Sequence, residues 1–185
     1  MAKDKDQNSI FAITKNLTIT CFISGIIIAA VYYVTSPVAA RKQVQIQNDT
    51  MRVLVNDADK FSKVNGKKDW YAAQKGNKTI AYVVPAESKG YGGAIELLVA
   101  VTPDGKVIDF SIVSHNETPG LGANASKDSF RGQFKDKKAD ALTVVKDKSN
   151  TKNIQAMTGA TITSKAVTKG VKEAVVQVTT FTGGK

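Results

Sequence analysis

The chain contains few of the residues that bind metals or form covalent cross-links. Its 185 residues include one cysteine, Cys21, and one histidine, His115. A single cysteine excludes an intramolecular disulfide and any cysteine-ligated zinc or iron–sulfur site. We therefore expect no metal site, and if the protein carries electrons, an organic cofactor must hold them.

Acidic residues are also scarce. The sequence has 16 Asp and Glu against 26 Lys and Arg, which gives a net charge of +10. A basic balance of this size suits nucleic acid, an anionic membrane surface or a phosphorylated ligand. No acidic residue occurs between Asp147 and Glu173. Hydrophobic residues make up 42% of the chain, so a folded core is expected.

Charged residues are absent from the segment Leu17 to Val34, "LTITCFISGIIIAAVYYV". A helix of this length spans about 27 Å, close to the thickness of a bilayer's hydrocarbon core. Tyr32 and Tyr33 stand at its end, where aromatic rings favour the membrane boundary. We expect one uncleaved membrane anchor. A cleaved secretory signal is the alternative, because "VAA" before Arg41 resembles a cleavage site, but the apolar core of a signal is usually shorter.

The charges on the two sides of this segment are nearly balanced. Lys3, Lys5 and Lys15 precede it, and Arg41 and Lys42 follow it. The difference is too small for the positive-inside rule to set the orientation. The short N-terminal tail favours a cytoplasmic N-terminus with the rest of the chain outside.

The remaining sequence predicts an α+β domain with an antiparallel sheet flanked by helices. Strands are expected at residues 78–86, where Pro85 ends the strand, and at 94–101, 106–114 and 141–145. The turn "TPDG" predicts that the second and third of these form a hairpin. Helices are expected at residues 37–56, 127–138 and, for about four turns, around the apolar positions Val167, Val171, Ala174, Val175 and Val178. Residues 57–68 read as a charged connector.

The start of the C-terminal helix, "MTGATITSKAVTKGV", has small residues and hydroxyls but no acid. A helix N-terminus presents unpaired N–H groups and a partial positive charge. Gly159 and Ala160 leave the backbone accessible, and hydroxyls come from Thr158, Thr161, Thr163 and Ser164. A phosphate would satisfy these groups. Simple N-capping by threonine is the alternative, because such helix starts are common.

The segment "TGATITS" resembles the flavin-attachment motif of the FMN-binding domain family. That family includes the G subunit of Rnf complexes (RnfG) and the C subunit of the sodium-pumping quinone reductases (NqrC). The resemblance implies that Thr161 forms a phosphoester with FMN, which a separate flavin transferase attaches. It also implies that the cofactor site includes Thr158, Gly159, Ala160, Ile162, Thr163, Ser164 and Lys165. Gln155 stands where many members have an acidic residue.

A second similarity lies upstream. The segments "GYGGAIELLVAV" and "SHNETPGLGA" resemble the family's glycine turn, hairpin and flavin-proximal loop, in the same order. This resemblance adds to the expected FMN site Tyr91, Gly92, His115, Glu117, Thr118, Pro119, Gly120, Leu121 and Gly122. From the residues alone, Pro119 and Gly120 equally suit a type II turn without a ligand, and His115 suits a surface or hydrogen-bonded histidine. The "GYGG" segment is most simply a flexible entry to the hairpin.

With the anchor, the resemblance covers nearly the whole chain, and RnfG looks closer than NqrC. It implies four parts: a tail (1–16), a transmembrane helix (17–35), a juxtamembrane helix and connector (36–68) and an FMN-binding domain (69–185). The implied function is electron transfer by covalent FMN in a membrane complex that couples ferredoxin:NAD⁺ oxidoreduction to Na⁺ or H⁺ translocation. The implied partners are other Rnf subunits, among them membrane and iron–sulfur subunits, and membrane lipid. The chain alone would not be catalytically complete.

Two functions of other classes stay open. The first is a membrane-anchored basic module that binds anionic lipid or polymer, with an affinity that falls steeply with salt. The second is a stand-alone flavin reductase with exchangeable FMN. The sequence shows no signature of a nicotinamide site, because Gly120 and Gly122 follow no βαβ pattern. A nucleic-acid partner is not expected.

Overall fold

A computed structural model of the chain describes residues 10–147 and 149–183. It forms two compact units, Met1–Gln47 and Asn48–Lys185. The first unit contains most of helix α1, and the second contains the sheet, the other helices and the candidate site. Each unit is described separately. The boundary expected at residue 69 stays a prediction.

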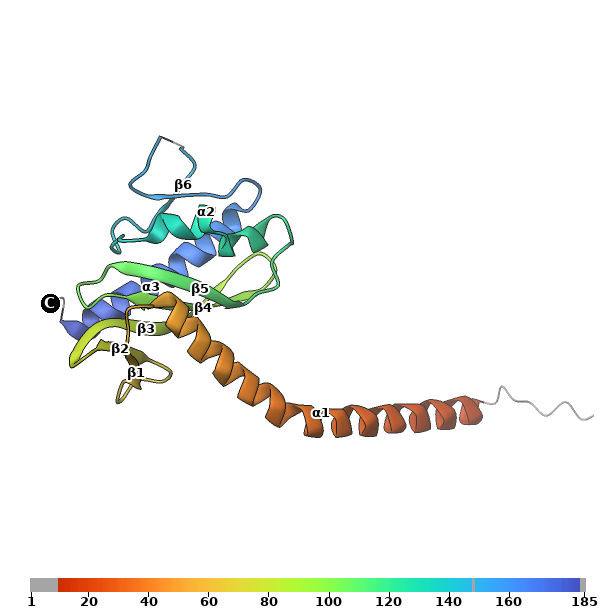
Figure 1. Cartoon of the computed structure of the whole chain (residues 1–185). Helices are drawn as coiled ribbons and strands as arrows, with labels where there is room; N and C mark the ends of the chain where they lie inside the picture. Colours follow the sequence, from red (N-terminus) through yellow and green to blue (C-terminus); the bar gives the residue numbers. More distant parts are fainter. Residues whose placement is uncertain (1–9, 148, 184–185) are drawn as a thin grey trace, which may run out of the picture. The chain divides into compact units, whose positions relative to one another are not determined.

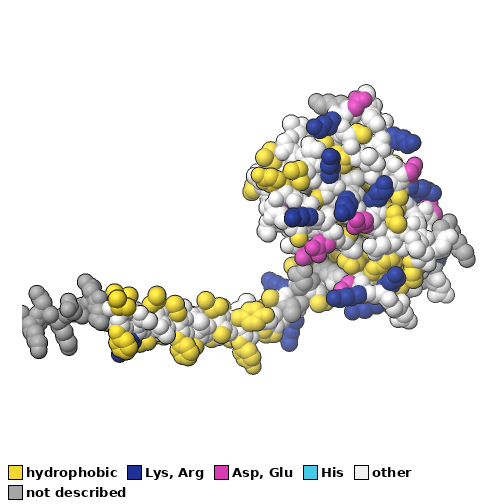
Figure 2. Space-filling view, turned by 180° about the vertical axis from the view of Figure 1, so that it is seen from behind, with side chains coloured by type: hydrophobic (Ala, Val, Ile, Leu, Met, Phe, Trp, Pro, Cys, Tyr) yellow, Lys and Arg dark blue, Asp and Glu magenta, His cyan; other side chains and the backbone are white. Residues whose placement is uncertain are grey.

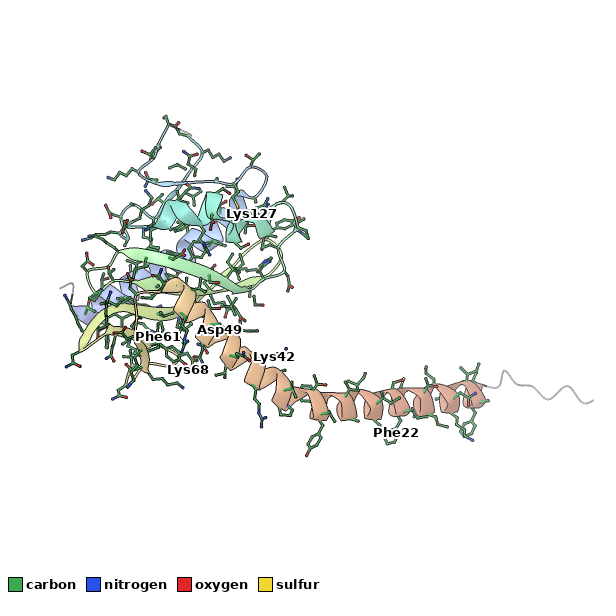
Figure 3. The ribbon with its side chains drawn as sticks, viewed as in Figure 1. Phe22, Lys42, Asp49, Phe61, Lys68 and Lys127 are labelled. Atoms are coloured by element: carbon green, nitrogen blue, oxygen red, sulfur yellow. The ribbon has the colours of Figure 1, made fainter. Side chains whose placement is uncertain are left out.

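Helix α1, Ile10–Leu54, is 45 residues long and contains the expected membrane segment. Figure 2 shows apolar side chains along this segment and basic side chains on either side of it. Phe22, which Figure 3 labels, is 71% exposed on the helix. The most apolar 18-residue window has a mean hydropathy of 2.1, and none of it is buried against the rest of the described chain. By length and composition, α1 is able to cross a membrane.

The helix expected for residues 37–56 is the continuation of α1, which passes through Pro37. Proline inside a helix removes one backbone hydrogen bond but does not always end the helix. Within the second unit, the end of α1 is an amphipathic packing element. Met51, Leu54 and the following Val55 are buried against the sheet.

Five strands form one antiparallel sheet in chain order, which Figure 1 shows beside α3. Their bounds are β1 Lys60–Lys63, β2 Tyr71–Lys75, β3 Lys78–Lys89, β4 Ala94–Val101 and β5 Val107–Ser114. The predicted α+β class and antiparallel sheet are confirmed. The predicted hairpin between β4 and β5 is confirmed too: the Thr102 N–H donates to the Lys106 carbonyl (2.8 Å), and Gly105 has a φ of 81°.

Strand β4 lies at the centre of the core because both of its faces are covered. Leu97, Val99 and Val101 belong to the cluster that packs against α3, while Leu98 and Ala100 belong to the cluster that covers the end of α1. Successive side chains of a strand point to opposite faces. A strand covered on both faces is therefore continuously apolar, as "ELLVAV" is after its exposed glutamate.

Two predictions about strands were wrong. β3 continues through Pro85 to Lys89. Because β2 pairs with β3 only as far as Val83, the rest of β3 is an edge on that side, where proline's missing donor is tolerated. The connector predicted for residues 57–68 contains β1, which pairs with β2 although half of its residues are exposed.

Helix α3, Thr161–Thr182, packs on β3 and β4. All five apolar positions from which this helix was predicted are fully buried, so the periodicity is confirmed. At 22 residues, α3 is longer than expected. The Ser88 hydroxyl donates to the Ala166 carbonyl (2.7 Å), which fixes α3 to β3.

The helix predicted for residues 127–138 is shorter and broken. It consists of α2, Asp128–Arg131, and the 3-10 turn η2, Gly132–Phe134, which follow a first 3-10 turn η1, Gly122–Ser126. The helical path ends because Lys135 is not helical and Asp136 has a φ of 61°. The strand predicted for residues 141–145 is reduced to β6, Val144–Val145, which pairs in parallel with β7, Ile154–Gln155.

Candidate functional site

A cavity of about 510 Å³ lies at the N-terminus of α3. Three segments line it: Tyr91, the loop residues Glu117, Thr118, Leu121 and Gly122, and residues 159–163. Its volume falls within the range of about 300–1,000 Å³ that is typical of small-molecule and cofactor sites. Every lining residue is one that the sequence placed in the FMN site. The structure thus brings together the glycine turn, the loop and the helix start.

The first turn of α3 has no cap. Ala160 holds the N-cap position, no side chain caps the helix there, and the first turn contains no acidic residue. Among the described residues, no group accepts a hydrogen bond from the N–H of Ile162 or Thr163. The alternative of simple N-capping by threonine therefore does not apply here. The helix start offers unpaired donors and the positive end of its dipole.

The hydroxyls of the helix start differ in their bonding. The Ser164 hydroxyl donates to the Ala160 carbonyl (2.8 Å) and accepts the N–H of Met157 (3.0 Å). Thr163 is buried, and its hydroxyl donates to the Glu117 carboxylate. Thr161 is half-buried, and its hydroxyl has no partner within the described part of the chain. Of the two helix-start threonines that line the cavity, Thr161 is thus the one available for reaction.

Gly159 keeps the backbone before the helix accessible. Its φ of 75° is a conformation that side chains rarely adopt, and a Cβ there would lie 3.1 Å from Leu121 Cδ2. Thr158 is exposed and lies outside the cavity lining. It lines a second hollow of about 430 Å³, to which Met157, Gln155 and Lys127 also contribute. Figure 3 labels Lys127, which immediately precedes α2.

The loop forms the type II turn that its sequence suggests. The Leu121 N–H donates to the Thr118 carbonyl (3.2 Å), and Gly120 at the third position has a φ of 78°. The turn and the ligand hypothesis are compatible, because Thr118 and Leu121 line the cavity. Pro119 and Gly120 do not.

The other predicted site residues outside the lining are His115, Gly92, Ser164 and Lys165. His115 Nδ1 accepts the N–H of Glu117 (3.1 Å), so the histidine shapes the loop. The Gly92 N–H donates to Glu117 Oε1 (2.9 Å), so Gly92 fixes a carboxylate that lines the cavity without lining it itself.

Glu117 is the acidic residue of the lining and is 6% exposed. Its two oxygens accept from different segments, one from Gly92 and one from Thr163. No ion pair to Glu117 occurs among the described residues. The carboxylate is therefore held by neutral donors.

The sequence did not predict a role for Gly90. A Cβ at this position would clash with Glu117 Oε1 and with Ile95. Its φ is not in the positive range, so glycine is needed there for space. The glycine could be seen in the sequence, next to "YGG". Its role in leaving space was missed because the segment was interpreted as a flexible entry to the hairpin.

Comparisons with known proteins show the family to which the chain belongs. The FMN-binding domain family model matches residues 90–176, which include the whole lining. Over the full length of both chains, the sequence is 98% identical to the G subunit of the proton-translocating ferredoxin:NAD(+) oxidoreductase complex of Clostridium ljungdahlii. The chain belongs to the RnfG family. The G subunit of the Na(+)-translocating ferredoxin:NAD(+) oxidoreductase complex of Acetobacterium woodii is 32% identical over 86% of this chain and 81% of that one.

Solved structures show the same fold as this RnfG chain. The C subunit of the Na(+)-translocating NADH-quinone reductase from Parabacteroides distasonis has a TM-score of 0.52 and 25% identity over 63% of each chain. NqrC of Shewanella oneidensis has a TM-score of 0.54 and 21% identity over 71% of this chain and 74% of that one. The family predicted from the two motifs is confirmed, and FMN is the cofactor class that its domain binds.

Proposed function

We propose that this RnfG chain carries electrons on an FMN that is covalently attached to Thr161. The observation that carries the proposal is the unpaired Thr161 hydroxyl at an uncapped helix start that faces a cofactor-sized cavity. In this step Thr161 Oγ1 attacks the flavin-side phosphorus of a flavin dinucleotide, the P–O bond of the diphosphate breaks, the other mononucleotide leaves, and the hydroxyl proton is released. A flavin transferase catalyses the transfer.

The residues present fit an FMN. The N–H groups of Ile162 and Thr163 would hold the phosphate at the positive end of α3. Tyr91 is 73% exposed at the cavity and offers a ring face for stacking, and Leu121 adds apolar surface. When bound, the flavin supplies one- and two-electron chemistry. The tether keeps its local concentration at about millimolar, whatever the supply of free cofactor.

The chain acts within a membrane complex. We propose that its partners are the other Rnf subunits and lipid around α1, and that the complex transfers electrons between ferredoxin and NAD⁺. We assign proton coupling because the relative at 98% identity is named proton-translocating. Residues 17–34 contain no Asp, Glu, Lys, Arg or His, so the ion path must lie in partner subunits. We place the N-terminus in the cytoplasm and the flavin domain outside.

The two other functions have less support. A module that binds anionic polymer would gather its cations in one patch. On the face that Figure 2 shows, Lys and Arg are scattered among other side chains. A stand-alone reductase with exchangeable FMN would not need an unpaired hydroxyl at the phosphate end of its cavity.

The test is to produce the full chain together with a flavin transferase and to examine a denaturing gel for flavin fluorescence. Wild type and Thr161→Ser keep a hydroxyl and should fluoresce, whereas Thr161→Ala should not. Thr180→Ala is the matched control, because Thr180 is exposed near the far end of the same helix. It should fluoresce like wild type.

Mass spectrometry of the intact chain gives the second readout. We expect one flavin phosphoester on the peptide that contains Thr161. A non-fluorescent wild type that binds flavin reversibly would support the reductase. A wild type without any flavin would support the basic module, and either result would refute covalent electron transfer.

A further inference from the structure

The buried carboxylate of Glu117 lies where three separate segments of the chain meet. It belongs to the loop that lines the cavity. One oxygen accepts the N–H of Gly92, 25 residues earlier, and the other accepts the hydroxyl of Thr163, 46 residues later. A single side chain thus joins the glycine turn, the loop and the first turn of α3.

Two glycines leave the room that this carboxylate occupies. A Cβ at Gly90 would clash with Glu117 Oε1. A Cβ at Gly122 would clash with Glu117 Oε2 and would lie 2.7 Å from the Thr163 hydroxyl. Neither glycine has a positive φ, so neither is required for backbone freedom. The segments around the cavity are therefore packed to accommodate Glu117.

The hydrogen bonds of Glu117 assign it a supporting role. Each oxygen is already engaged by a protein donor, and a buried carboxylate that loses a donor suffers a large desolvation penalty. The donors are therefore held firmly in place. No cation pairs with Glu117 among the described residues, so no neighbouring positive charge offsets a charge on this carboxylate.

We propose that Glu117 is the positioning residue of the flavin site. It holds the Tyr91 turn and the loop against the first turn of α3, so that the cavity keeps its shape before the cofactor is attached. Its charge also disfavours the electron density that a flavin gains on reduction, and so lowers the flavin's midpoint potential. This second effect rests on the proposed function, because it requires FMN in this cavity.

The positioning role is tested without flavin. Amide hydrogen exchange is measured by mass spectrometry on the full chain in detergent, in the flavin-free Thr161→Ala background. Glu117→Ala should speed exchange in the segment around Gly92 by about tenfold or more. Glu117→Gln keeps an oxygen acceptor for Gly92 and should largely restore protection. Glu96→Ala, which removes an exposed carboxylate from β4, should change nothing.

The charge effect is tested on the flavinylated full chain by redox titration. Glu117→Gln preserves the side-chain shape and removes the charge, so the midpoint potential should shift to a more positive value. Glu96→Gln should leave the potential unchanged. If Glu117→Gln keeps protection around Gly92 near wild type and still shifts the potential, the shift comes from the lost charge and not from a changed structure.

A second pair of variants keeps the proposal testable if Glu117→Ala does not fold. Thr163→Val removes the hydroxyl that Glu117 accepts, and Thr163→Ser retains it. Exchange around Gly92 should rise in the valine variant and return toward wild type in the serine variant.

Equal exchange in the two Thr163 variants, or wild-type exchange in Glu117→Ala, would overturn the positioning role. An unchanged potential in Glu117→Gln would overturn the charge effect. If the wild type carries no flavin on Thr161, the proposed function fails instead, and the exchange result still decides the role of Glu117.

Discussion

At the scale of single residues, the hydroxyls of "TGATITS" differ because their neighbours differ. Ser164 and Thr163 are buried and hydrogen-bonded, whereas the hydroxyl of Thr161 has no partner within the described chain. Burial and hydrogen bonding restrain a hydroxyl, so only an accessible and unpaired one can react readily with an approaching phosphorus centre. The selectivity that the motif implies thus has a structural explanation.

The close packing around Glu117 also depends on single residues and gives a prediction. Gly122→Ala would place a methyl group against Glu117 and Thr163, and it should destabilise the second unit by about 1–3 kcal/mol. Urea unfolding of the full chain in detergent measures this change. Trp70, the single tryptophan, is 5% exposed in the core and reports unfolding by its fluorescence.

Gly132→Ala is the matched control for this substitution. Gly132 is helical, and an added Cβ would meet no atom within 4 Å. Its stability should stay the same or rise by up to about 1 kcal/mol, because alanine restricts the unfolded chain. If Gly122→Ala and Gly132→Ala lose equal stability, crowding against Glu117 and Thr163 does not explain the effect of Gly122→Ala.

At the scale of elements, α3 serves both the core and the site. Its middle and end are held by apolar residues that pack on β3 and β4, so its first turn need not contribute a cap to stability. Most helical stability in proteins comes from such packing. The helix start can therefore keep its donors unpaired for a phosphate.

This division of roles predicts opposite effects of an added acid. Ile162 is 56% exposed in the first turn, and Ile162→Glu should stabilise the flavin-free chain by about 0.3–1 kcal/mol through the helix dipole. The same charge should repel the flavin phosphate and lower the yield of fluorescent protein. Ile162→Gln is the neutral control. It should gain less stability and lose less flavin fluorescence than Ile162→Glu. Full flavinylation of Ile162→Glu would contradict a phosphate at this helix start.

At the scale of the whole molecule, one apolar helix segment is able to cross a membrane, and the proposed flavin site lies in the other unit. The segment contributes no charged or histidine side chain for ion transfer. Under the proposed function, the flavin domain therefore needs partner subunits both to receive electrons and to couple electron transfer to ion movement. Its contribution is a fixed position for the cofactor.

The proposed orientation is tested by cysteine labelling. In a Cys21→Ser background, Lys138→Cys places a thiol on an exposed position of the second unit. A membrane-impermeant maleimide should label it in intact cells. Asn8→Cys, in the predicted tail, should be labelled only after the membrane is permeabilised. The reverse pattern would place the flavin domain in the cytoplasm.

The features that depend on local order could be predicted from the amino-acid sequence. An uncharged apolar run predicts the membrane segment within α1, the turn residues of "TPDG" predict the hairpin, and a period of 3.6 predicts α3. The family followed from two motifs in the chain. Strand β1 was missed because its pairing with β2 forms it. The passage of β3 through Pro85 was missed because β3 pairs with β4 as far as Lys89, although its pairing with β2 stops at Val83.

The assembly of the site depends on contacts between segments that are far apart in the chain. The bonds from Glu117 to Gly92 and Thr163 join residues far apart in the chain, and no local pattern encodes such contacts. Gly90 leaves room for the Glu117 carboxylate, because a Cβ there would clash with it. Glu117 also pairs with the hydroxyl of Thr163, whereas the hydroxyl of Thr161 has no partner in the described chain. Local propensities determine where helices and strands form. Burial and hydrogen bonding between distant segments determine which hydroxyl groups of the site stay free to react.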